Sequence, residues 1–345
     1  MDLTTLTAAD ILGISDDFPE KLYSFNHAKD EYRKLCSIWH PDRNTDSQAV
    51  QVFQQIKHLY DIAEKRITND MWCGPAELII TSNEGKQFKF KYRKAVDITI
   101  GKLYIGMKFL VYVIDNDNKD LFDNGIKMIK SIKYSTPKFE EQFKRQMPNI
   151  VRVIETPLTS VVVMEKTEEL IRLKDLLNYL PDHKLDPKHV AWIMSTLCNM
   201  ACFFELNGIV HNAITTENFW ISPEYHSGVL FDGWWYARRT GEKLLALPSE
   251  SIAVLPSEVL TEKIAKSKYD RTLIKAVGIE SLGDSTRLGS MLLKDKTIPK
   301  SVLEWLRNPV ASTAVEDYKK WGNARDNGFG ERKFIPLTVD ITKIY

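Results

Sequence analysis

The first seventy residues place apolar side chains at steps of three and four, the spacing of one side of a helix. A short apolar piece covers residues 8–14, and a longer helix is predicted from about Pro19, because proline suits the first turn. Pro41 stops this helix, since the residue before a proline avoids the helical region. The stripe before Pro41 contains Leu22, Phe25, Ala28, Tyr32, Leu35 and Trp39, and the stripe after it contains Ala49, Val52, Phe53, Ile56, Tyr60, Ala63 and Ile67. The pattern predicts an antiparallel helical hairpin.

Between residues 78 and 164 the pattern changes to short runs that alternate apolar with polar residues or are wholly apolar. Such runs indicate strands. They lie at residues 78–81, 88–92, 98–105, 108–115, 125–131 and 160–164, with another strand expected after residues 148–151 and a polar helix over residues 136–146. From Leu173 onward the pattern is helical, and the longest helix is expected over residues 186–206. Strands followed by helices predict an α+β fold class, with a two-lobed domain after the N-terminal all-α hairpin.

These patterns divide the chain into domains. The N-terminal helical domain is expected over residues 1–68, and Gly74-Pro75 marks a linker over residues 69–75. The larger domain is expected over residues 76–335, with a tail over residues 336–345. The border between its strand-rich lobe (76–170) and its helical lobe (171–335) falls before Leu173.

The last part of the chain carries two further amphipathic helices, at residues 299–306 and 312–321. Residues 323–333 are rich in turn formers, and we predict an exposed loop or mobile arm there.

Composition excludes some classes of protein. The chain has 345 residues, 43% of them hydrophobic and 27% charged, which rules out a wholly disordered or collagen-like chain. The net charge of +1 gives no overall electrostatic reason to expect nucleic acid or an anionic membrane as partner. Aromatic and basic residues alternate over residues 88–93, which fits a nucleic-acid platform or an amphipathic strand with one basic face, and we favour the strand.

The expected location is the cytoplasm. Residues 1–10 contain no basic segment followed by an apolar run, so they do not resemble a signal peptide. Uninterrupted apolar runs reach about six residues, against the roughly 20 that a membrane helix needs. The four cysteines are scattered, and the spacing of Cys198 and Cys202 is not that of a zinc pair. Reduced thiols of a cytoplasmic protein are therefore expected.

One loop carries a recognisable motif. The stretch between the two predicted helices reads His40-Pro41-Asp42-Arg43-Asn44, preceded by Tyr32-Arg33-Lys34-Leu35 and followed by Phe53-x-x-Ile56. Residues 5–67 resemble a J domain, the module by which DnaJ-type co-chaperones engage DnaK-type chaperones. The simpler alternative is that Pro41 and Asp42 only stop a helix and make a turn.

The J-domain resemblance implies a chaperone-binding surface. The H-P-D tripeptide would lie at the tip of the hairpin, where the Asp42 carboxylate meets a cationic group of the partner. A basic face of the preceding helix would meet an acidic surface of the chaperone. The residues expected at this surface are Lys29, Arg33, Lys34, His40, Pro41, Asp42 and Arg43. The segment is acidic overall, with eight Lys and Arg against eleven Asp and Glu over residues 1–66, so this basic face is local.

A second resemblance covers residues 96 to about 310, which look like a protein-kinase fold. Residues 211–218, His-Asn-Ala-Ile-Thr-Thr-Glu-Asn, are similar to the catalytic loop H-R-D-L-K-x-x-N. Residues 230–233, Leu-Phe-Asp-Gly, stand where a kinase carries its D-F-G aspartate. Residues 256–258, Pro-Ser-Glu, resemble the A-P-E motif.

The strand-rich lobe adds weaker kinase signals. Lys127 is expected on the third strand, where it resembles the V-A-I-K lysine. Glu140 or Glu141 on the following helix would pair with this lysine. Gly101 and Gly106 take the first and third positions of a G-x-G-x-x-G loop.

The departures from the kinase pattern affect catalysis most. A kinase needs an aspartate to orient the substrate hydroxyl and accept its proton, and Ala213 stands there. Asn212 replaces the arginine of H-R-D, and Thr215 replaces the nearby lysine. Leu103 replaces the middle glycine, and the D-F-G phenylalanine is missing after Asp232. The resemblance therefore implies a pseudokinase that transfers phosphate poorly or not at all.

Part of the nucleotide-holding set remains. The resemblance implies ATP held by Lys127 with Glu140, and Mg²⁺ held by oxygen atoms of Asn218 and Asp232. His211 is expected to support the loop structurally.

The function expected from both resemblances is that of a co-chaperone or adaptor. It would recruit and stimulate a DnaK-type ATPase, while the kinase-like domain binds a protein client or nucleotide. One alternative is an atypical Ser/Thr kinase that uses another carboxylate, such as Glu217. Another is a purely structural docking protein. Such a pairing of modules resembles bacterial or large-phage proteins, and no membrane or nucleic-acid partner is expected.

Overall fold

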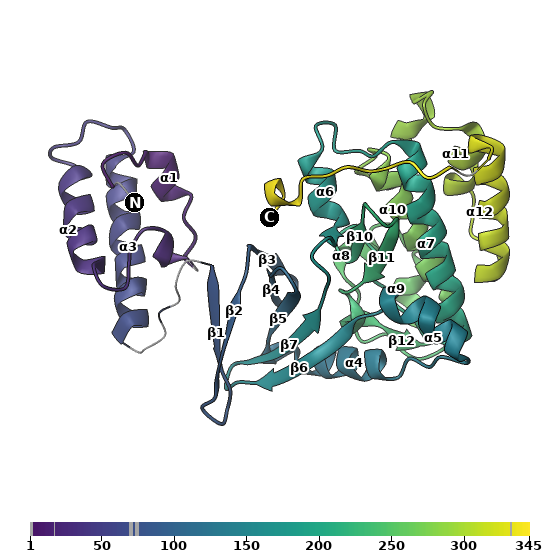
Figure 1. The fold of residues 1–345 in the computed structure, drawn as a ribbon, viewed down its shortest axis with the longest axis horizontal. Coiled ribbons are helices and arrows are strands. Elements are labelled where there is room, and N and C mark those ends of the chain that lie inside the picture. Colours follow the sequence, from purple (N-terminus) through teal and green to yellow (C-terminus); the bar gives the residue numbers. More distant parts are fainter. Residues whose placement is uncertain (1–2, 17, 69–71, 73–75, 332) are drawn as a thin grey trace. The chain divides into compact units, whose positions relative to one another are not determined.

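The computed structural model describes residues 3–16, 18–68, 72, 76–331 and 333–345. The chain forms two compact units, Met1–Ala95 with Glu155–Pro157, and Val96–Ile154 with Leu158–Tyr345. Apart from Trp72, the predicted linker over residues 69–75 lies outside the described residues. Figure 1 labels the helices and strands of both units, and each unit is described by itself.

The first unit contains the predicted helical hairpin. Helices α2 (Ala28–Ile38) and α3 (Ala49–Thr68) pack against each other, with the short α1 (Ala8–Leu12) against α3. Helix α1 starts at a capping box, in which the Thr7 and Asp10 side chains bind each other's backbone N–H. The two apolar stripes form one core, whose fully buried members include Ile11, Leu22, Leu35, Val52, Ile56 and Leu59. The predicted hairpin is confirmed.

The predicted start of the longer helix is wrong. Residues Pro19–Lys21 form only a 3₁₀ turn, and α2 begins nine residues after Pro19, at Ala28. The Glu31 carboxylate accepts hydrogen bonds from the Ser24 backbone N–H (2.6 Å) and hydroxyl (2.9 Å). Serine bonded in this way favours a turn over a helix interior, so the helix starts after it.

A β-hairpin completes the first unit. Strands β1 (Glu77–Thr81) and β2 (Gln87–Lys91) pair antiparallel, with Ile79 opposite Lys89. Lys89 and Lys91 are exposed while the phenylalanines between them are half-buried, so an amphipathic strand with one basic face is confirmed. The kinase-like domain was predicted to start at residue 76, whereas the structure groups this hairpin with the first unit.

The strand-rich part of the second unit is a five-stranded sheet in the order β3-β4-β5-β7-β6. Its strands are β3 (Lys94–Ile98), β4 (Gly101–Ile105), β5 (Phe109–Asp115), β6 (Asn149–Glu155) and β7 (Thr159–Glu165). The run 98–105, predicted as one strand, is therefore two, joined at Thr99-Ile100. Helix α5 (Pro137–Phe143) confirms the predicted polar helix.

The strand predicted at residues 125–131 is wrong, because this segment is the second half of helix α4 (Lys119–Lys130). The buried residues of α4 recur at helical spacing, and they are Leu121, Phe122, Asn124, Gly125, Met128 and Ile129. The few residues after Gly125 alternate in polarity, so their pattern fits a strand as well as a helix. Packing of the apolar side of α4 decides in favour of the helix.

The helical lobe is built around α7 (Pro187–Leu206), which packs against α10 (Ser267–Ser281) and α12 (Ala314–Phe329). Among the described residues, α7 is the one helix long and apolar enough to cross a membrane. Eleven of its residues are buried inside the second unit, as in a core helix.

The smaller elements of this lobe are short. They are β8 (Ile171–Arg172), α6 (Leu173–Tyr179), β9 (Ile209–Val210), β10 (Phe219–Ser222), β11 (Ser227–Leu230), η4 (Trp234–Tyr236), β12 (Arg238–Arg239), α8 (Ser249–Ile252), α9 (Glu258–Glu262), η5 (Met291–Lys294), α11 (Lys300–Arg307) and η6 (Ile341–Lys343).

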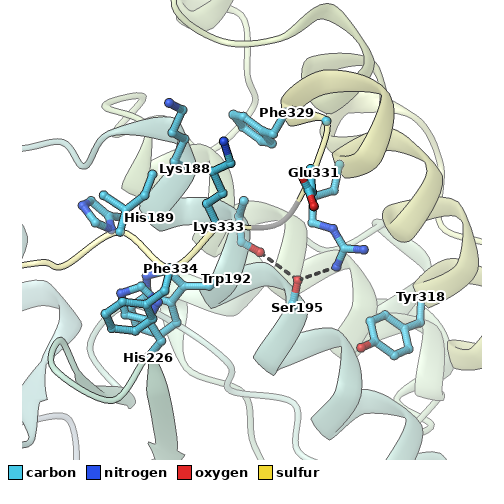
Figure 2. A pocket seen from close by; sticks show the side chains of 14 residues that line it. Lys188, His189, Trp192, Ser195, His226, Tyr318, Phe329, Glu331, Lys333 and Phe334 are labelled. Carbon is cyan, nitrogen blue, oxygen red and sulfur yellow. Dashed lines mark hydrogen bonds between the residues drawn. The ribbon is translucent and has the colours of Figure 1, made fainter.

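The exposed loop predicted over residues 323–333 is wrong for most of its length, because α12 continues to Phe329. Two side chains attach this helix to α7: the Trp321 indole N–H and the Arg325 guanidinium donate to the Ser195 hydroxyl, at 2.9 and 3.3 Å. Figure 2 shows Ser195 with two of its hydrogen bonds, and Trp321 is not drawn there. These tertiary contacts outweigh the turn-forming composition.

Candidate functional site

The loop between α2 and α3 holds His40-Pro41-Asp42 in a closed turn. The His40 carbonyl accepts hydrogen bonds from the backbone N–H groups of Arg43 (2.9 Å) and Asn44 (2.8 Å). The Asn44 amide donates to the carbonyl of Ile38 at 3.1 Å, which fastens the loop to the end of α2. The tripeptide therefore has one defined conformation at the tip of the helical hairpin.

The His40 ring positions Asp42. The ring meets Phe53 of α3 edge-on, with centroids 5.5 Å apart. Its Nδ1 atom accepts the backbone N–H of Asp42 at 3.3 Å. The Asp42 side chain remains 85% exposed, so its carboxylate is available to a partner.

The basic face of α2 is exposed. Lys29, Arg33 and Lys34 are all accessible, and so is Arg43 in the loop. Arg33 lies 3.7 Å from Asp30, but both side chains are more than two-thirds exposed, so this pair contributes little to stability. The face can therefore meet an acidic surface without breaking a strong internal bond.

Tyr23 stabilises the packing of this domain. Its position beside the apolar stripe did not predict that role. Its ring is 2% exposed, and its hydroxyl donates to the Ile56 carbonyl at 2.7 Å. Tyr60 meets Tyr23 edge-on and stacks on Tyr32, with centroids 5.7 and 4.2 Å apart. These rings fix α2 against α3, and thereby the loop between them.

In the second unit, the loop that resembles the kinase catalytic loop is held by Asp270 of α10. The carboxylate accepts the backbone N–H groups of His211 (2.7 Å) and Asn212 (2.8 Å). Burial raises the pKa of Asp270 to about 7, although both hydrogen bonds act in the opposite direction. Asn212 has a φ of 64°, and its side-chain amide donates to the carbonyls of Val210 and Tyr236.

His211 packs inside the second unit, and neither of its ring nitrogens has a hydrogen-bond partner among the described residues. Its ring is fully buried and meets the Trp234 ring edge-on, with the two ring centroids 4.9 Å apart. Burial lowers the pKa of His211 to about 3, so the imidazole is neutral at physiological pH. Ala213 beside it is also fully buried, and its methyl group can neither orient a hydroxyl nor accept a proton.

Asp232 lines a small cavity of the second unit, which we call the cleft. Its Oδ2 atom accepts the indole N–H of Trp220 at 3.3 Å, and the side chain is almost fully buried. Burial raises the pKa of Asp232 to about 6, while the Arg172 guanidinium and the neighbouring hydroxyl of Tyr112 lower it. Tyr112 belongs to β5, the central strand of the sheet.

The side-chain amide of Asn218 is bound within its own loop. Its amide donates to the Ala213 carbonyl at 2.7 Å. Gly233 is in the left-handed region, with φ of 83°, and a Cβ atom there would come within 2.8 Å of Ala213, Asn218 and His211. This crowding explains the glycine after Asp232.

The structure does not bring the predicted nucleotide-binding set together. Asn218 and Asp232 line one small cavity, but Lys127 lies on α4 and Glu140 on α5, and neither lines it. The Glu140 carboxylate is bound to Lys144 at 2.8 Å instead. The placement of Lys127 on a strand is thus wrong, and Tyr112 is the β5 side chain beside Asp232.

The predicted glycine loop is also wrong. Gly101 begins strand β4, where a Cβ atom would lie 2.1 Å from the Val113 carbonyl oxygen of the neighbouring strand. Leu103 is a fully buried strand residue, and Gly106 stands in the turn before β5. Gly101 allows close packing of β4 on β5 and Gly106 lies in the following turn, so the two glycines do not form the predicted phosphate-binding loop.

Aromatic side chains fill the cleft. Trp235 stacks on Phe122 of α4 and meets Tyr112 edge-on, with centroids 6.1 and 5.6 Å apart. The Asn124 amide donates to the carbonyls of Trp235 (3.0 Å) and Ala237 (2.9 Å), which ties α4 to this segment. The cavity beside Asp232 has a volume of only about 50 Å³.

The cavity beside Asp232 is too small to hold ATP as it stands. Ligand sites usually have volumes of about 300–1,000 Å³, and this cavity falls well below that range. The Asn218 side-chain nitrogen donates to a carbonyl and Asp232 Oδ2 accepts an indole N–H, whereas Asp232 Oδ1 is buried with no hydrogen-bond partner among the described residues. Within the described ranges, no group of three or more His, Cys, Asp or Glu side chains could hold a metal ion. Binding of ATP and Mg²⁺ by this domain stays a prediction.

Comparison with known families identifies the first of these sites. Residues 10–66 match the family described as the DnaJ domain. The N-terminal segment is a J domain. A J domain implies a DnaK-type chaperone as partner, and the ordered H-P-D loop described above is its characteristic motif. No curated protein matches the chain.

Comparison with solved structures identifies the fold of the second unit. The structure titled vaccinia related kinase 3 is similar with a TM-score of 0.52 and 15% identity, over 75% of this chain and 94% of that one. The BubR1 kinase domain is similar with a TM-score of 0.49 and 14% identity, over 69% and 80% of the two chains. The first of these shows a protein-kinase fold. The chain therefore joins a J domain to a kinase-like domain.

Proposed function

We propose that this chain is a J-domain co-chaperone that recruits and stimulates a DnaK-type ATPase, with a pseudokinase domain that docks a protein client. The observation that carries the proposal is an ordered H-P-D loop with an exposed Asp42, in a chain whose kinase-like cleft lacks a catalytic carboxylate at Ala213. The experiment that tests it is the ATPase rate of the chaperone with and without this protein.

The J domain would act by binding, without chemistry of its own. The exposed Asp42 carboxylate would pair with a cationic group of the chaperone, and a bidentate carboxylate–guanidinium pair would fix its orientation. The basic face of α2 would steer the approach to an acidic surface. Preferential binding to the hydrolysis-competent state of the ATPase would shift the chaperone towards that state.

Two features support a docking role for the kinase-like domain over an active kinase. Ala213 removes the group that would accept the substrate proton, and aromatic side chains fill the cleft. Glu217, the alternative carboxylate, lies 3.4 Å from the Arg172 guanidinium, and its backbone carbonyl accepts the Arg172 Nε–H at 2.6 Å. A carboxylate held in this way is a poor general base. The alternative of a purely structural docking protein includes the same docking of a client but no DnaK-type partner.

Reversing charge on the basic face should slow binding to the chaperone. In a Lys29→Glu/Lys34→Glu variant we expect the association rate to fall about tenfold at low salt, because steering by opposite charges is lost. The difference should shrink at 0.5 M salt, where charges are screened beyond roughly 4 Å. Lys57→Glu, on the exposed side of α3, is the matched control. Equal rates for all three proteins in surface plasmon resonance would contradict the role of this face.

Nucleotide should not stabilise the intact chain. Because the cavity beside Asp232 has about 50 Å³, we expect 1 mM ATP with Mg²⁺ to shift the melting temperature by less than about 1 °C, since only a ligand that binds the native state stabilises it. Transfer of labelled phosphate to protein substrates should also be absent. A clear shift that an Asp232→Asn variant loses would support the nucleotide-binding prediction and contradict this one.

A further inference from the structure

The last residues of the chain lie along the kinase-like domain as an extended segment. Over residues 335–341, half-buried positions alternate with exposed ones, the pattern of a strand-like segment with one face on the protein. The inward residues are Ile335, Leu337, Val339 and Ile341, and the last three pack against the core of the second unit. Figure 1 shows this segment in yellow, running from the end of α12 towards α6. We call residues 333–345 the strap.

The beginning of the strap is held by stacked rings. Phe334 stacks on His226 and His226 stacks on Trp192 of α7, with centroids 4.2 and 4.7 Å apart. A cavity of about 640 Å³ lies beside these rings (Figure 2) and is lined in part by Lys333 and Ile335. Because the strap borders a cavity here and Phe334 is 63% exposed, this end is loosely packed.

The end of the strap is bound more specifically. A 3₁₀ turn, Ile341–Lys343, directs the chain inward, and the backbone N–H groups of Ile344 and Tyr345 donate to the Ile341 carbonyl. The Tyr345 hydroxyl accepts the backbone N–H of Arg172 at 2.8 Å. Its ring lies 6.4 Å from that of Trp220. Burial, and then the nearby charge of Asp175, raise the pKa of Tyr345.

Of the residues that Tyr345 contacts, Arg172 lines the small cavity and Trp220 binds Asp232, which lines it. Arg172 donates its Nε–H to the Glu217 carbonyl and lies close enough to Asp232 to lower the pKa of that carboxyl group. Trp220 donates its indole N–H to Asp232. Arg172 and Glu217 line the small cavity together with Asp232. Tyr345 does not itself line this cavity, but on the side of β8 and β10 it is bonded to Arg172, which does.

We propose that the strap is a displaceable closure of the kinase-like cleft, with Tyr345 occupying a site that an outside ligand must free before it can enter. The site offers one backbone N–H and one indole face, so its incoming ligand is a planar aromatic group with a hydrogen-bond acceptor. The closure is a property of the second unit and does not depend on the co-chaperone role.

Hydrogen exchange of the Arg172 amide tests the closure directly, because this N–H donates to the Tyr345 hydroxyl. In the full chain, Tyr345→Phe should raise exchange in peptides covering residues 170–176, since the ring remains but the acceptor is lost. Deletion of residues 336–345 should raise it further, by about tenfold or more, because water then reaches the N–H. Lys343→Ala, at an exposed position of the same turn, is the control and should leave exchange unchanged.

Peptides of α7 report whether the second unit stays folded in these variants. Faster exchange at residues 170–176 with unchanged α7 peptides supports the proposal. Unchanged exchange at residues 170–176 in the deletion variant overturns it. If the deletion also loosens α7, Tyr345→Phe decides: local acceleration supports the closure, and none overturns it.

Discussion

Replacing His40 with glutamine is expected to abolish stimulation of the chaperone ATPase and leave the J domain folded. The ring packs edge-on against Phe53, and its Nδ1 atom accepts the Asp42 N–H. Glutamine has neither the ring nor a fixed acceptor at that position, so the loop loses the contact that orients Asp42. Because an oriented charge pair depends on geometry as well as distance, we expect the rate to return to its unstimulated value.

The matched control is His27→Gln. His27 is exposed and precedes α2, and it makes no capping hydrogen bond with its side chain. This variant should stimulate the ATPase as the unchanged protein does. Circular dichroism of both variants should show the same helix content, because the buried core of α2 and α3 is untouched. Normal stimulation by the His40→Gln protein would remove the basis for the co-chaperone proposal.

The J domain could be predicted from sequence because its information is local. The stripes at helical spacing and the H-P-D tripeptide fall within a few dozen residues, and each implies its structure without distant contacts. The exception was the start of α2, where the stripe continued through Leu22 and Phe25. There a bond from Ser24 to Glu31, seven residues away, set the boundary instead.

The kinase-like site could be predicted only in part. The division into a strand-rich and a helical part could be predicted, and so could the nearness of Asn218 and Asp232 to one cavity. Lys127 was misplaced because Ile126, Lys127 and Met128 alternate like a strand, although α4 is set by packing. Partners far apart in sequence gave no signal at all: Asp270 binds a loop 59 residues away, and Tyr345 binds Arg172 across 173 residues.

Asp270 should dominate the stability of the kinase-like domain, and Asp270→Ala is expected to lower the free energy of unfolding by about 3–5 kcal/mol. The carboxylate accepts two backbone N–H groups, from His211 and Asn212, and its side chain is 2% exposed. Alanine leaves both donors buried and unpaired, at about 1–3 kcal/mol each. It also leaves a small void beneath the loop.

Urea unfolding followed by tryptophan fluorescence measures this effect, because most tryptophans lie in the second unit: Trp192, Trp220, Trp234, Trp235, Trp305 and Trp321. Asp182→Ala, at an exposed turn residue of the same lobe, is the control and should change stability by less than about 0.5 kcal/mol. Asp270→Asn should fall between the two, since an amide oxygen can accept one of the two N–H groups. If Asp270→Ala unfolds like the control, the loop is held by other contacts, and the Asn212 bonds to Val210 and Tyr236 become the candidates.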